Sequence, residues 1–185
     1  MPGVVEAALE LVQEEGPEGL TVRALARRAG VAPMSIYNHF GGKNGVIDAI
    51  IIEGFALLAR MADTTLEDPR ENLLAGSRAY RDFALRHRAH YTVMFLHRFI
   101  GYDPSNETLN AAYRGVEILS GQVQRCVDAG YFAGRLGTDV AQQLWASVHG
   151  YVALEISGIN FASERARVFD QLIEGLLLGL DAAGN

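Results

Sequence analysis

The sequence predicts an all-α protein, and three observations support this. Apolar residues recur at helical spacing through nearly every segment, and Gly, Pro and capping residues separate these segments. No run alternates apolar and polar residues as a half-buried strand does. With 185 residues, of which 49% are hydrophobic, the chain is long enough to bury a core, and its composition excludes disorder. We expect about nine helices in two domains, residues 1–46 and 47–185.

Capping residues and helix breakers mark the expected helix boundaries. Thr21 is a typical N-cap, and Gly30 is a typical C-terminal residue for the helix between them. Pro33 stands at the first position of the next helix, where its missing N–H costs nothing. Asp68-Pro69-Arg70-Glu71 combines an N-cap, a proline and an acid. The expected helices are, in order, residues 5–15, Val22–Ala29, Pro33–Phe40, Lys43–Ala62, Pro69–Arg86, His90–Phe99, 109–127, 139–157 and 162–182.

Several features limit the kind of protein that this is. Cys126 is the single cysteine, so neither an internal disulfide nor a thiolate zinc site holds the fold. The longest uncharged run near the C-terminus, Val140–Leu154, is shorter than the roughly 20 residues of a membrane helix. Met1-Pro2-Gly3 has no basic region before its apolar residues. We therefore expect a cytoplasmic protein with no signal peptide, lipid anchor or membrane partner.

The net charge of −6 is unevenly distributed along the chain. Residues 1–15 carry −4, residues 16–45 carry +3, and residues 46–185 carry −5. The basic segment contains Arg23, Arg27, Arg28 and Lys43 against Glu18. A local positive face is what phosphate binding needs, because affinity for a duplex comes from ion pairs at the docking surface. A solvated helix face explains the same charges equally well.

The two short helices around Gly30 have the outline of a helix-turn-helix, which is a DNA-binding motif. With Ile36 and Phe40 turned inward, the other side chains of the second short helix can reach base edges or phosphates. Asn38 can bind adenine in a bidentate manner, and Met34 can contact a thymine methyl group. An ordinary helical hairpin with a polar face is the alternative.

The stretch from Leu20 to Lys43 resembles the TetR family of bacterial transcriptional regulators. A Thr-x-Arg start, an Ala-Gly-Val turn, a Tyr-x-His-Phe end and a following Lys occur in register, and the match covers about residues 4–52. The resemblance implies a repressor whose third helix enters the major groove of a DNA operator. Its C-terminal helices would bind a small-molecule effector and form a homodimer. By position, the expected phosphate contacts are Thr21, Arg23, Tyr37, His39 and Lys43. The residues expected to face bases are Pro33, Met34, Ser35 and Asn38.

Two features depart from the family pattern. Family members usually carry basic residues before the first helix, whereas only residues 1–4 precede it here. Either a basic arm is missing or fewer phosphate contacts form. Gly42, Asn44 and Gly45 stand where the fourth helix usually has a Ser cap and an acid. Each glycine weakens a helical turn by about 1 kcal/mol relative to Ala, so a soft hinge is expected there.

An aromatic-rich part of the chain predicts a ligand region. Residues 80–102 hold more aromatic side chains than one core stripe requires, although core packing explains most of them. Trp145-Ala-Ser-Val-His149-Gly150 resembles the Trp-x-x-x-His-Gly signature of one class of TetR-type ligand domains. Trp145 and His149 lie one helical turn apart, so they either line a cavity or form a core pair. The expected ligand-binding residues are Tyr80, Phe83, His87, Tyr91, Met94, Phe95, Tyr113, Trp145 and His149.

No metal, cofactor or catalytic residue is expected. His87, His90 and His97 fall at spacings of three and seven, but no carboxylate lies between Arg86 and Arg98, and the arginines there repel a cation. The sequence contains no nucleophile elbow, phosphate loop or His-Glu-x-x-His motif.

The last two helices predict a surface for a second copy of the chain. Their apolar residues extend too far around the helix for one buried stripe, and Gly175 and Gly179 permit close backbone approach. Pairing with their copies gives a four-helix bundle, which resembles the family's dimer, whereas a fully buried helix is the alternative. The expected interface residues are Val148, Val152, Phe169, Leu172, Leu176 and Gly179.

These observations together predict a ligand-responsive DNA-binding regulator. We expect a homodimeric repressor that a small, largely apolar effector releases from a palindromic operator. A helical small-molecule-binding protein without DNA binding is the alternative, and an enzyme is the third hypothesis.

Overall fold

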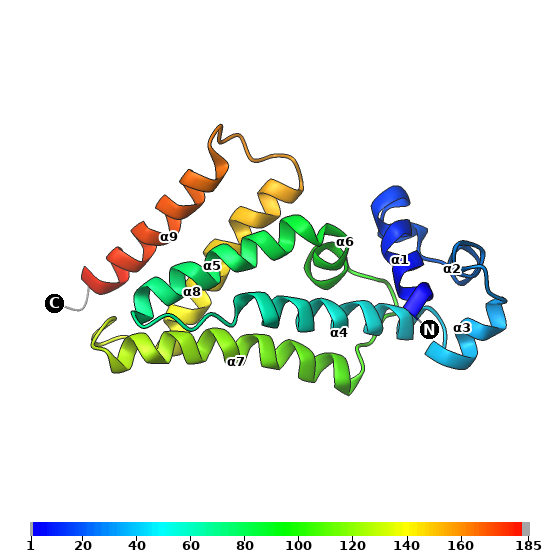
Figure 1. Cartoon of the computed structure of the whole chain (residues 1–185), viewed down its shortest axis with the longest axis horizontal. Helices are drawn as coiled ribbons and strands as arrows, with labels where there is room; N and C mark the ends of the chain where they lie inside the picture. The colour runs from blue at the N-terminus through cyan, green and yellow to red at the C-terminus, as the bar shows by residue number, and fades with distance from the viewer. Residues whose placement is uncertain (1, 183–185) are drawn as a thin grey trace. The chain divides into compact units, whose positions relative to one another are not determined.

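The computed structural model describes residues 2–182, and Met1 and residues 183–185 lie outside this range. The expectation of no signal peptide therefore rests in part on Met1, which is outside the described residues. In this part of the chain the structure has nine α-helices and no strand, which confirms the all-α prediction (Figure 1). The α-helices are α1 (Pro2–Glu15), α2 (Val22–Ala29), α3 (Pro33–Phe40), α4 (Lys43–Ala62), α5 (Pro69–Arg86), α6 (Arg88–Tyr91), α7 (Asn106–Asp128), α8 (Gly137–Ile156) and α9 (Arg165–Ala182). A 3-10 turn, η1 (Pro17–Gly19), and a π-helix, η2 (Thr92–Leu96), complete the set.

The expected bounds of α2, α3, α4 and α5 agree with the structure, whereas the helix expected over His90–Phe99 is wrong. That segment is the short α6 followed directly by the π-helix η2. The His97 backbone N–H donates to the Thr92 carbonyl at 2.9 Å, which is the wider i→i+5 pattern. His97 itself is extended, with φ −118° and ψ 131°. The apolar residues of this segment indicate burial, but they do not distinguish one helix type from another.

The chain forms two compact units, and neither is continuous in sequence. The first unit combines residues 2–57 with His87–Tyr113, and the second combines Leu58–Arg86 with residues 114–182. In the second unit α5, α8 and α9 pack against one another. The boundary expected between residues 46 and 47 falls inside α4, and that division into domains stays a prediction.

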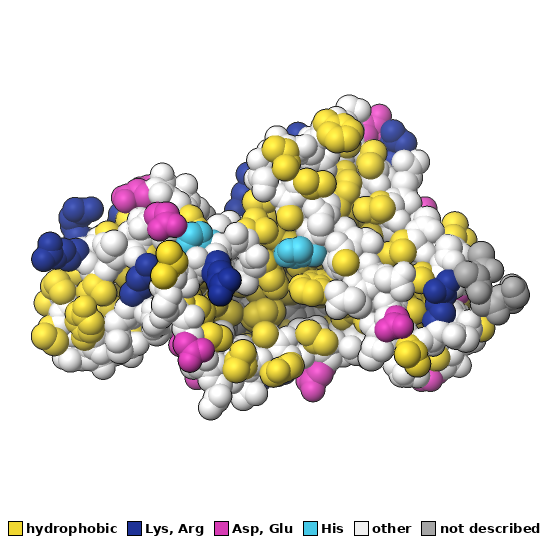
Figure 2. Space-filling model, turned by 180° about the vertical axis from the view of Figure 1, so that it is seen from behind, with side chains coloured by type: hydrophobic (Ala, Val, Ile, Leu, Met, Phe, Trp, Pro, Cys, Tyr) yellow, Lys and Arg dark blue, Asp and Glu magenta, His cyan; other side chains and the backbone are white. Residues whose placement is uncertain are grey.

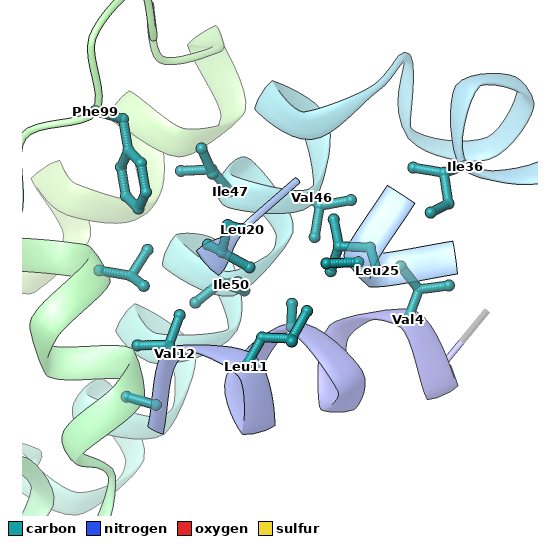
Figure 3. Close-up of a cluster of buried hydrophobic side chains, with 14 of the residues drawn as sticks. Val4, Leu11, Val12, Leu20, Leu25, Ile36, Val46, Ile47, Ile50 and Phe99 are labelled. Carbon is teal, nitrogen blue, oxygen red and sulfur yellow. The ribbon is translucent and has the colours of Figure 1, made fainter. Parts of the chain in front are cut away.

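The core of the first unit joins α1, α2 and α3 to the first half of α4 and to residues 89–99. Figure 3 shows Leu11, Leu25 and Ile36 meeting Val46 and Ile50 in this core. Each of these side chains is almost fully buried, so together they remove a large apolar area from water. The short helices α2 and α3 therefore depend on tertiary packing, because isolated helices of this length are not stable.

Asp48 on α4 fixes the start of α7 within the first unit. Its Oδ1 accepts hydrogen bonds from the Tyr102 hydroxyl at 2.7 Å, the Ser105 backbone N–H at 3.2 Å and the Thr108 hydroxyl at 2.5 Å. Burial and the bond to Asp48 raise the pKa of Tyr102 above its usual value. One turn earlier, the Asn44 amide donates to the Gly101 carbonyl at 3.3 Å. The first two turns of α4 are thus held by hydrogen bonds to residues 101–108.

The junction between α3 and α4 depends on glycine. Gly41 and Gly42 both adopt positive φ, at 71° and 116°, which other residues rarely adopt. A Cβ at Gly45 would overlap the Phe40 carbonyl oxygen, which is a backbone atom and cannot rotate away. Gly45 therefore has a packing role at this junction, beyond the weakening of the helix that the sequence suggested.

Replacement of Gly45 by alanine is expected to destabilise the protein by about 1–3 kcal/mol, because the added methyl group must displace the end of α3. Helix propensity alone predicts the opposite sign. Urea denaturation followed by circular dichroism measures the change. Gly121 is the matched control, since it lies inside α7 and a Cβ there meets no atom within 4 Å. Gly121→Ala is expected to stabilise, and stabilisation by both variants would contradict the Phe40 contact.

Candidate nucleic-acid interface

The helix-turn-helix begins with a side-chain cap on α2. The Thr21 hydroxyl accepts a hydrogen bond from the Ala24 backbone N–H at 3.1 Å, as the sequence predicts for an N-cap. This bond occupies one lone pair of the hydroxyl but leaves Thr21 at the protein surface. Ala24, Leu25 and Ala26 turn inward, so α2 lies close to its neighbours in the core.

A left-handed glycine sets the angle between α2 and α3. Gly30 has φ 66° and ψ 32°, and the Val31 backbone N–H donates to the Ala26 carbonyl at 3.0 Å. Pro33 then opens α3, and Ile36 is the fully buried residue that holds this helix against the core. Phe40 is partly buried and packs on the same cluster. The inward direction expected for both side chains is thus observed.

With Ile36 buried, the rest of α3 presents its side chains to solvent. Met34 is 64% exposed and Tyr37 is 52% exposed. Asn38 and His39 are exposed too, and Ser35 is partly exposed. All nine residues expected to contact DNA lie in the first unit, and none of them is buried. Six of them share one short helix, so they present base-reading and phosphate-binding chemistry side by side.

The three arginines of α2 differ in what they can bind. Arg28 donates to Glu14 at 2.6 Å and to Glu10 at 3.2 Å, both on α1. The hydrogen bond from Arg28 and the charge of its guanidinium hold the pKa of Glu14 below its usual value. Arg28 is therefore paired within the protein. Fewer positive side chains of this segment are free to bind phosphate than the sequence suggested. Arg23 and Arg27 are exposed and lie one turn apart on α2.

Lys43 extends the basic surface to the first turn of α4. Its ammonium lies 5.3 Å from the centre of the Phe99 ring, where the ring face attracts a cation. The positive end of the α4 dipole adds to the charge of this side chain. On the face shown in Figure 2, Lys and Arg side chains gather among hydrophobic ones at the left, where α2 and α3 lie. Arg27 is an exposed cation that our sequence-based list of contacts omitted.

The ligand residues expected in the second unit are partly in contact with one another. The Tyr80 hydroxyl and Nδ1 of His149 are 3.1 Å apart, and the rings of Trp145 and His149 are 5.5 Å apart. Burial lowers the pKa of His149, which favours its neutral form. Phe83 is fully buried, whereas Trp145 is 39% exposed. Tyr80, Trp145 and His149 thus form a polar and aromatic group between α5 and α8.

The ligand residues expected in the first unit lie around α6 and η2, except Tyr113. The rings of Tyr91 and Phe95 are 5.1 Å apart, and Phe95 also meets Phe55 of α4 at 5.7 Å. Burial lowers the pKa of His90, and the nearby Glu53 carboxylate opposes this effect. Other expected residues behave differently: His87 lies against the His90 ring, Met94 packs on the core cluster, and Tyr113 is 65% exposed on α7.

The three histidines considered for a metal site have separate surroundings. His87 and His90 lie against each other, with ring centres 5.8 Å apart. His97 instead lies 3.5 Å from a carboxylate oxygen of Glu18 and against the Phe99 ring. Within residues 2–182, no group of three His, Cys, Asp or Glu side chains is placed to hold a metal ion.

None of the helices described has the length and low polarity that a membrane crossing requires.

The expected dimer residues divide into two groups. Val148, Val152 and Phe169 are buried within the second unit, so they form its own core rather than a surface for a second copy. Their position on α8 and α9 was expected, but their burial depends on neighbours that the helical pattern does not identify. Leu172 is 40% exposed, Leu176 is partly exposed and Gly179 is exposed. Leu154 and Leu178, which the interface list did not include, are exposed large apolar residues on the same two helices.

An N-terminal and a C-terminal segment of the chain each match a known protein family. Residues 4–50 match the family described as "Bacterial regulatory proteins, tetR family". Residues 73–176 match the family described as "Tetracyclin repressor-like, C-terminal domain", and that match covers more than half of the chain.

Individual relatives agree with these families. The chain is 28% identical over 182 residues to the uncharacterized HTH-type transcriptional regulator Rv0681 of Mycobacterium tuberculosis, covering 96% of this chain and 80% of the relative. It is 28% identical over 190 residues to the tetracycline repressor protein class A from transposon 1721 of Escherichia coli, covering 98% of this chain and 81% of the relative. The crystal structure of the TetR family transcriptional regulator PfmR from Thermus thermophilus superposes with a TM-score of 0.75 at 20% identity, covering 95% of this chain and 97% of that one.

Proposed function

The chain belongs to the TetR family of DNA-binding transcriptional regulators, and we propose that it is a repressor that a small, largely apolar effector releases from a palindromic operator. The DNA-reading surface in this proposal is the outer face of α3 together with Thr21, Arg23 and Lys43. The observation that carries it is the exposure of Met34, Tyr37 and Asn38 on a helix that the buried Ile36 anchors. The apolar Met34 and the amide of Asn38 suit base edges in the major groove, and the Tyr37 hydroxyl suits a phosphate oxygen.

The proposed reading surface divides its contacts between bases and phosphates. Asn38 reads an adenine through its amide, and Met34, Ser35 and Pro33 contact neighbouring base edges. Arg23, Tyr37, His39, Lys43 and Thr21 anchor the backbone. Phosphate contacts supply affinity for any sequence, whereas base contacts distinguish one sequence from another. Arg28 has no part in this scheme, because Glu10 and Glu14 hold it.

The proposed effector binds in the C-terminal region. Two groups of aromatic side chains support this, namely Tyr80, Trp145 and His149 in the second unit, and Tyr91 with Phe95 in the first. Mostly aromatic linings with few polar groups are typical of small-molecule sites. The repressor role is inferred by similarity to the tetracycline repressor protein class A, and the apolar class of effector is inferred from these aromatic side chains. An effector that changes DNA affinity 5- to 150-fold needs a coupling free energy of only about 1–3 kcal/mol.

The proposed homodimer forms through the exposed apolar residues of α8 and α9. Leu154, Leu172 and Leu178 remain exposed in the single chain, and Gly175 and Gly179 allow two helices to approach closely. The homodimer has two helix-turn-helix units, here called heads, one from each chain. Two heads related by a two-fold axis read half-sites about one helical turn, or roughly 34 Å, apart. A wider spacing is compatible with the same symmetry. The operator is therefore expected to be a pseudo-palindrome.

A gel-shift titration tests the proposed function. The probes are the DNA upstream of the protein's own gene and duplexes selected from a random-sequence library, with an unrelated duplex as control. If the dimer neutralises about 6 phosphates, a plot of log affinity against log salt concentration has a slope near −5. A slope near zero, or no preference for the selected duplexes at any salt concentration, would contradict sequence-specific DNA binding. Chemical conversion of a compound that binds the protein would instead support the third hypothesis, that the chain is an enzyme.

A further inference from the structure

His39 combines an exposed position on α3 with a fixed hydrogen bond on one ring nitrogen. Its Nδ1 lies 3.0 Å from the Ser35 backbone carbonyl, one turn earlier in the same helix. A carbonyl oxygen has lone pairs and no hydrogen, so it can only accept. Nδ1 must therefore carry the hydrogen and donate it to Ser35.

This bond determines what the other ring nitrogen can do. A neutral imidazole has one N–H group, and here Nδ1 holds it, so Nε2 of neutral His39 presents a lone pair. A phosphate oxygen is also an acceptor, and two acceptors repel each other. As long as Nδ1 keeps its bond to Ser35, Nε2 donates to phosphate only after the ring takes up a second proton, when both nitrogens carry hydrogen. The imidazolium formed is also positive, which gives a charge-assisted bond to the anion.

We propose that His39 contacts the DNA backbone only as an imidazolium, so that each DNA-reading head takes up a proton at this residue when it binds a duplex. This inference rests on the proposed function and specifies the chemistry of one of its phosphate contacts. The proton comes from solvent and adds to Nε2, and no covalent bond to the DNA forms. By linkage, DNA affinity rises as the pH falls, because the bound state holds the additional proton.

The charges around α3 favour phosphate as the partner of this cation. α3 has no acidic residue, and the flanking segments, α2 and residues 41–47, have none either. The charged residues of those segments are Arg23, Arg27, Arg28 and Lys43, all positive. On α1, which packs against α2, Glu10 and Glu14 are engaged by Arg28, and the remaining acids, Glu6 and Glu15, are exposed. Glu18 lies against His97. A bound phosphate can supply the anion that stabilises the charged ring on α3 itself, where no acid is present.

The test measures binding of a 30-base-pair random-sequence duplex at pH 8 and pH 6, in several salt concentrations. A phosphate contact requires no particular sequence, so this probe does not depend on knowing the operator. Wild type is compared with His39→Gln, whose side-chain amide donates at either pH, and with His39→Ala, which cannot donate. His97→Gln is the matched control, because it removes a histidine of the same unit that lies against Glu18 and Phe99.

The inference predicts a specific pattern across these variants. Wild type and His97→Gln should bind more tightly at pH 6 than at pH 8, and affinity should rise by at most tenfold per pH unit per head, which is the limit for uptake of one proton. Their salt slope should be steeper at pH 6 by about 0.9 per head, which corresponds to one additional phosphate contact. His39→Gln should bind with little pH dependence, and His39→Ala should match wild type at pH 8 but lack the gain at pH 6.

Two results would overturn the inference. Wild-type binding that does not respond to pH would show that neutral His39 makes the contact or that none exists. An equal pH response in wild type, His39→Gln and His39→Ala would place the proton elsewhere. Absence of DNA binding by every variant at both pH values would instead refute the proposed function, so the two failures are distinguishable.

Discussion

Replacement of Glu155 by alanine is expected to lower the free energy of unfolding by about 3–5 kcal/mol, because it leaves the Arg81 guanidinium buried without its partner. The Glu155 carboxylate accepts from Nε of Arg81 at 2.8 Å and from Nη2 at 2.7 Å, which is a bidentate pair. The two side chains are only 5% and 14% exposed. The guanidinium also lies 5.7 Å from the centre of the Phe169 ring. Urea denaturation at one fixed protein concentration measures the loss.

The matched control for this variant is Glu174→Ala. Glu174 belongs to the same unit, but it is 50% exposed and its carboxylate lies 3.9 Å from Arg78, so water screens the pair. We expect a change within about 0.5 kcal/mol for this substitution. A double variant, Arg81→Met with Glu155→Met, should recover much of the loss, because it removes both buried charges. Losses of equal size for Glu155→Ala and Glu174→Ala would contradict the role of burial.

Helix boundaries with a local chemical signal could be predicted from the sequence alone. Thr21 caps α2, Gly30 ends it in a left-handed conformation, and Pro33 opens α3. Asp68 likewise accepts from the first backbone N–H groups of α5, at 2.8 Å. Each of these signals acts over three or four residues, which is why the order of residues is enough to detect it.

The partners of charged side chains could not be predicted in this way. Arg28 is bound by two glutamates on α1, 14 and 18 residues away. Arg81 and Glu155 are 74 residues apart. Helical periodicity tells which face of a helix a residue occupies, but it does not tell which helix covers that face. Arg28 was therefore counted with the exposed cations, and the buried pair in the second unit was not anticipated.

The same limit explains the correction on α8 and α9. A helix with apolar residues on several sides can bury all of them in one chain or share some with a second copy. The pattern therefore located the helices but did not separate Val148 and Phe169, which are buried, from Leu172, which is exposed. Gly45 presents a related case, because its close approach to the Phe40 carbonyl is visible only when α3 and α4 are placed in space.

Alanine at Asn38 should relax sequence preference at one position of each half-site without abolishing DNA binding. The exposed amide has both a donor and an acceptor, which suits a bidentate contact with adenine, and loss of that contact costs about 1–3 kcal/mol per head. Affinity for a duplex selected by the wild type is then expected to fall about 5- to 150-fold per head. Affinity for an unrelated duplex should be unchanged. Competition gel shifts with the two duplexes measure both quantities on one sample.

Arg23→Ala is the contrasting variant, because Arg23 lies exposed on the first turn of α2 and offers a charge rather than a base-reading amide. Its loss should weaken binding to both duplexes equally and make the salt slope shallower by about 1 per head. Selection from a random library with each variant completes the comparison. Asn38→Ala should recover sequences with one position relaxed in each half-site, whereas Arg23→Ala should recover the wild-type sequence. A uniform loss of affinity in Asn38→Ala would show that Asn38 contacts the backbone, and it would move base recognition to Met34, Ser35 or Pro33.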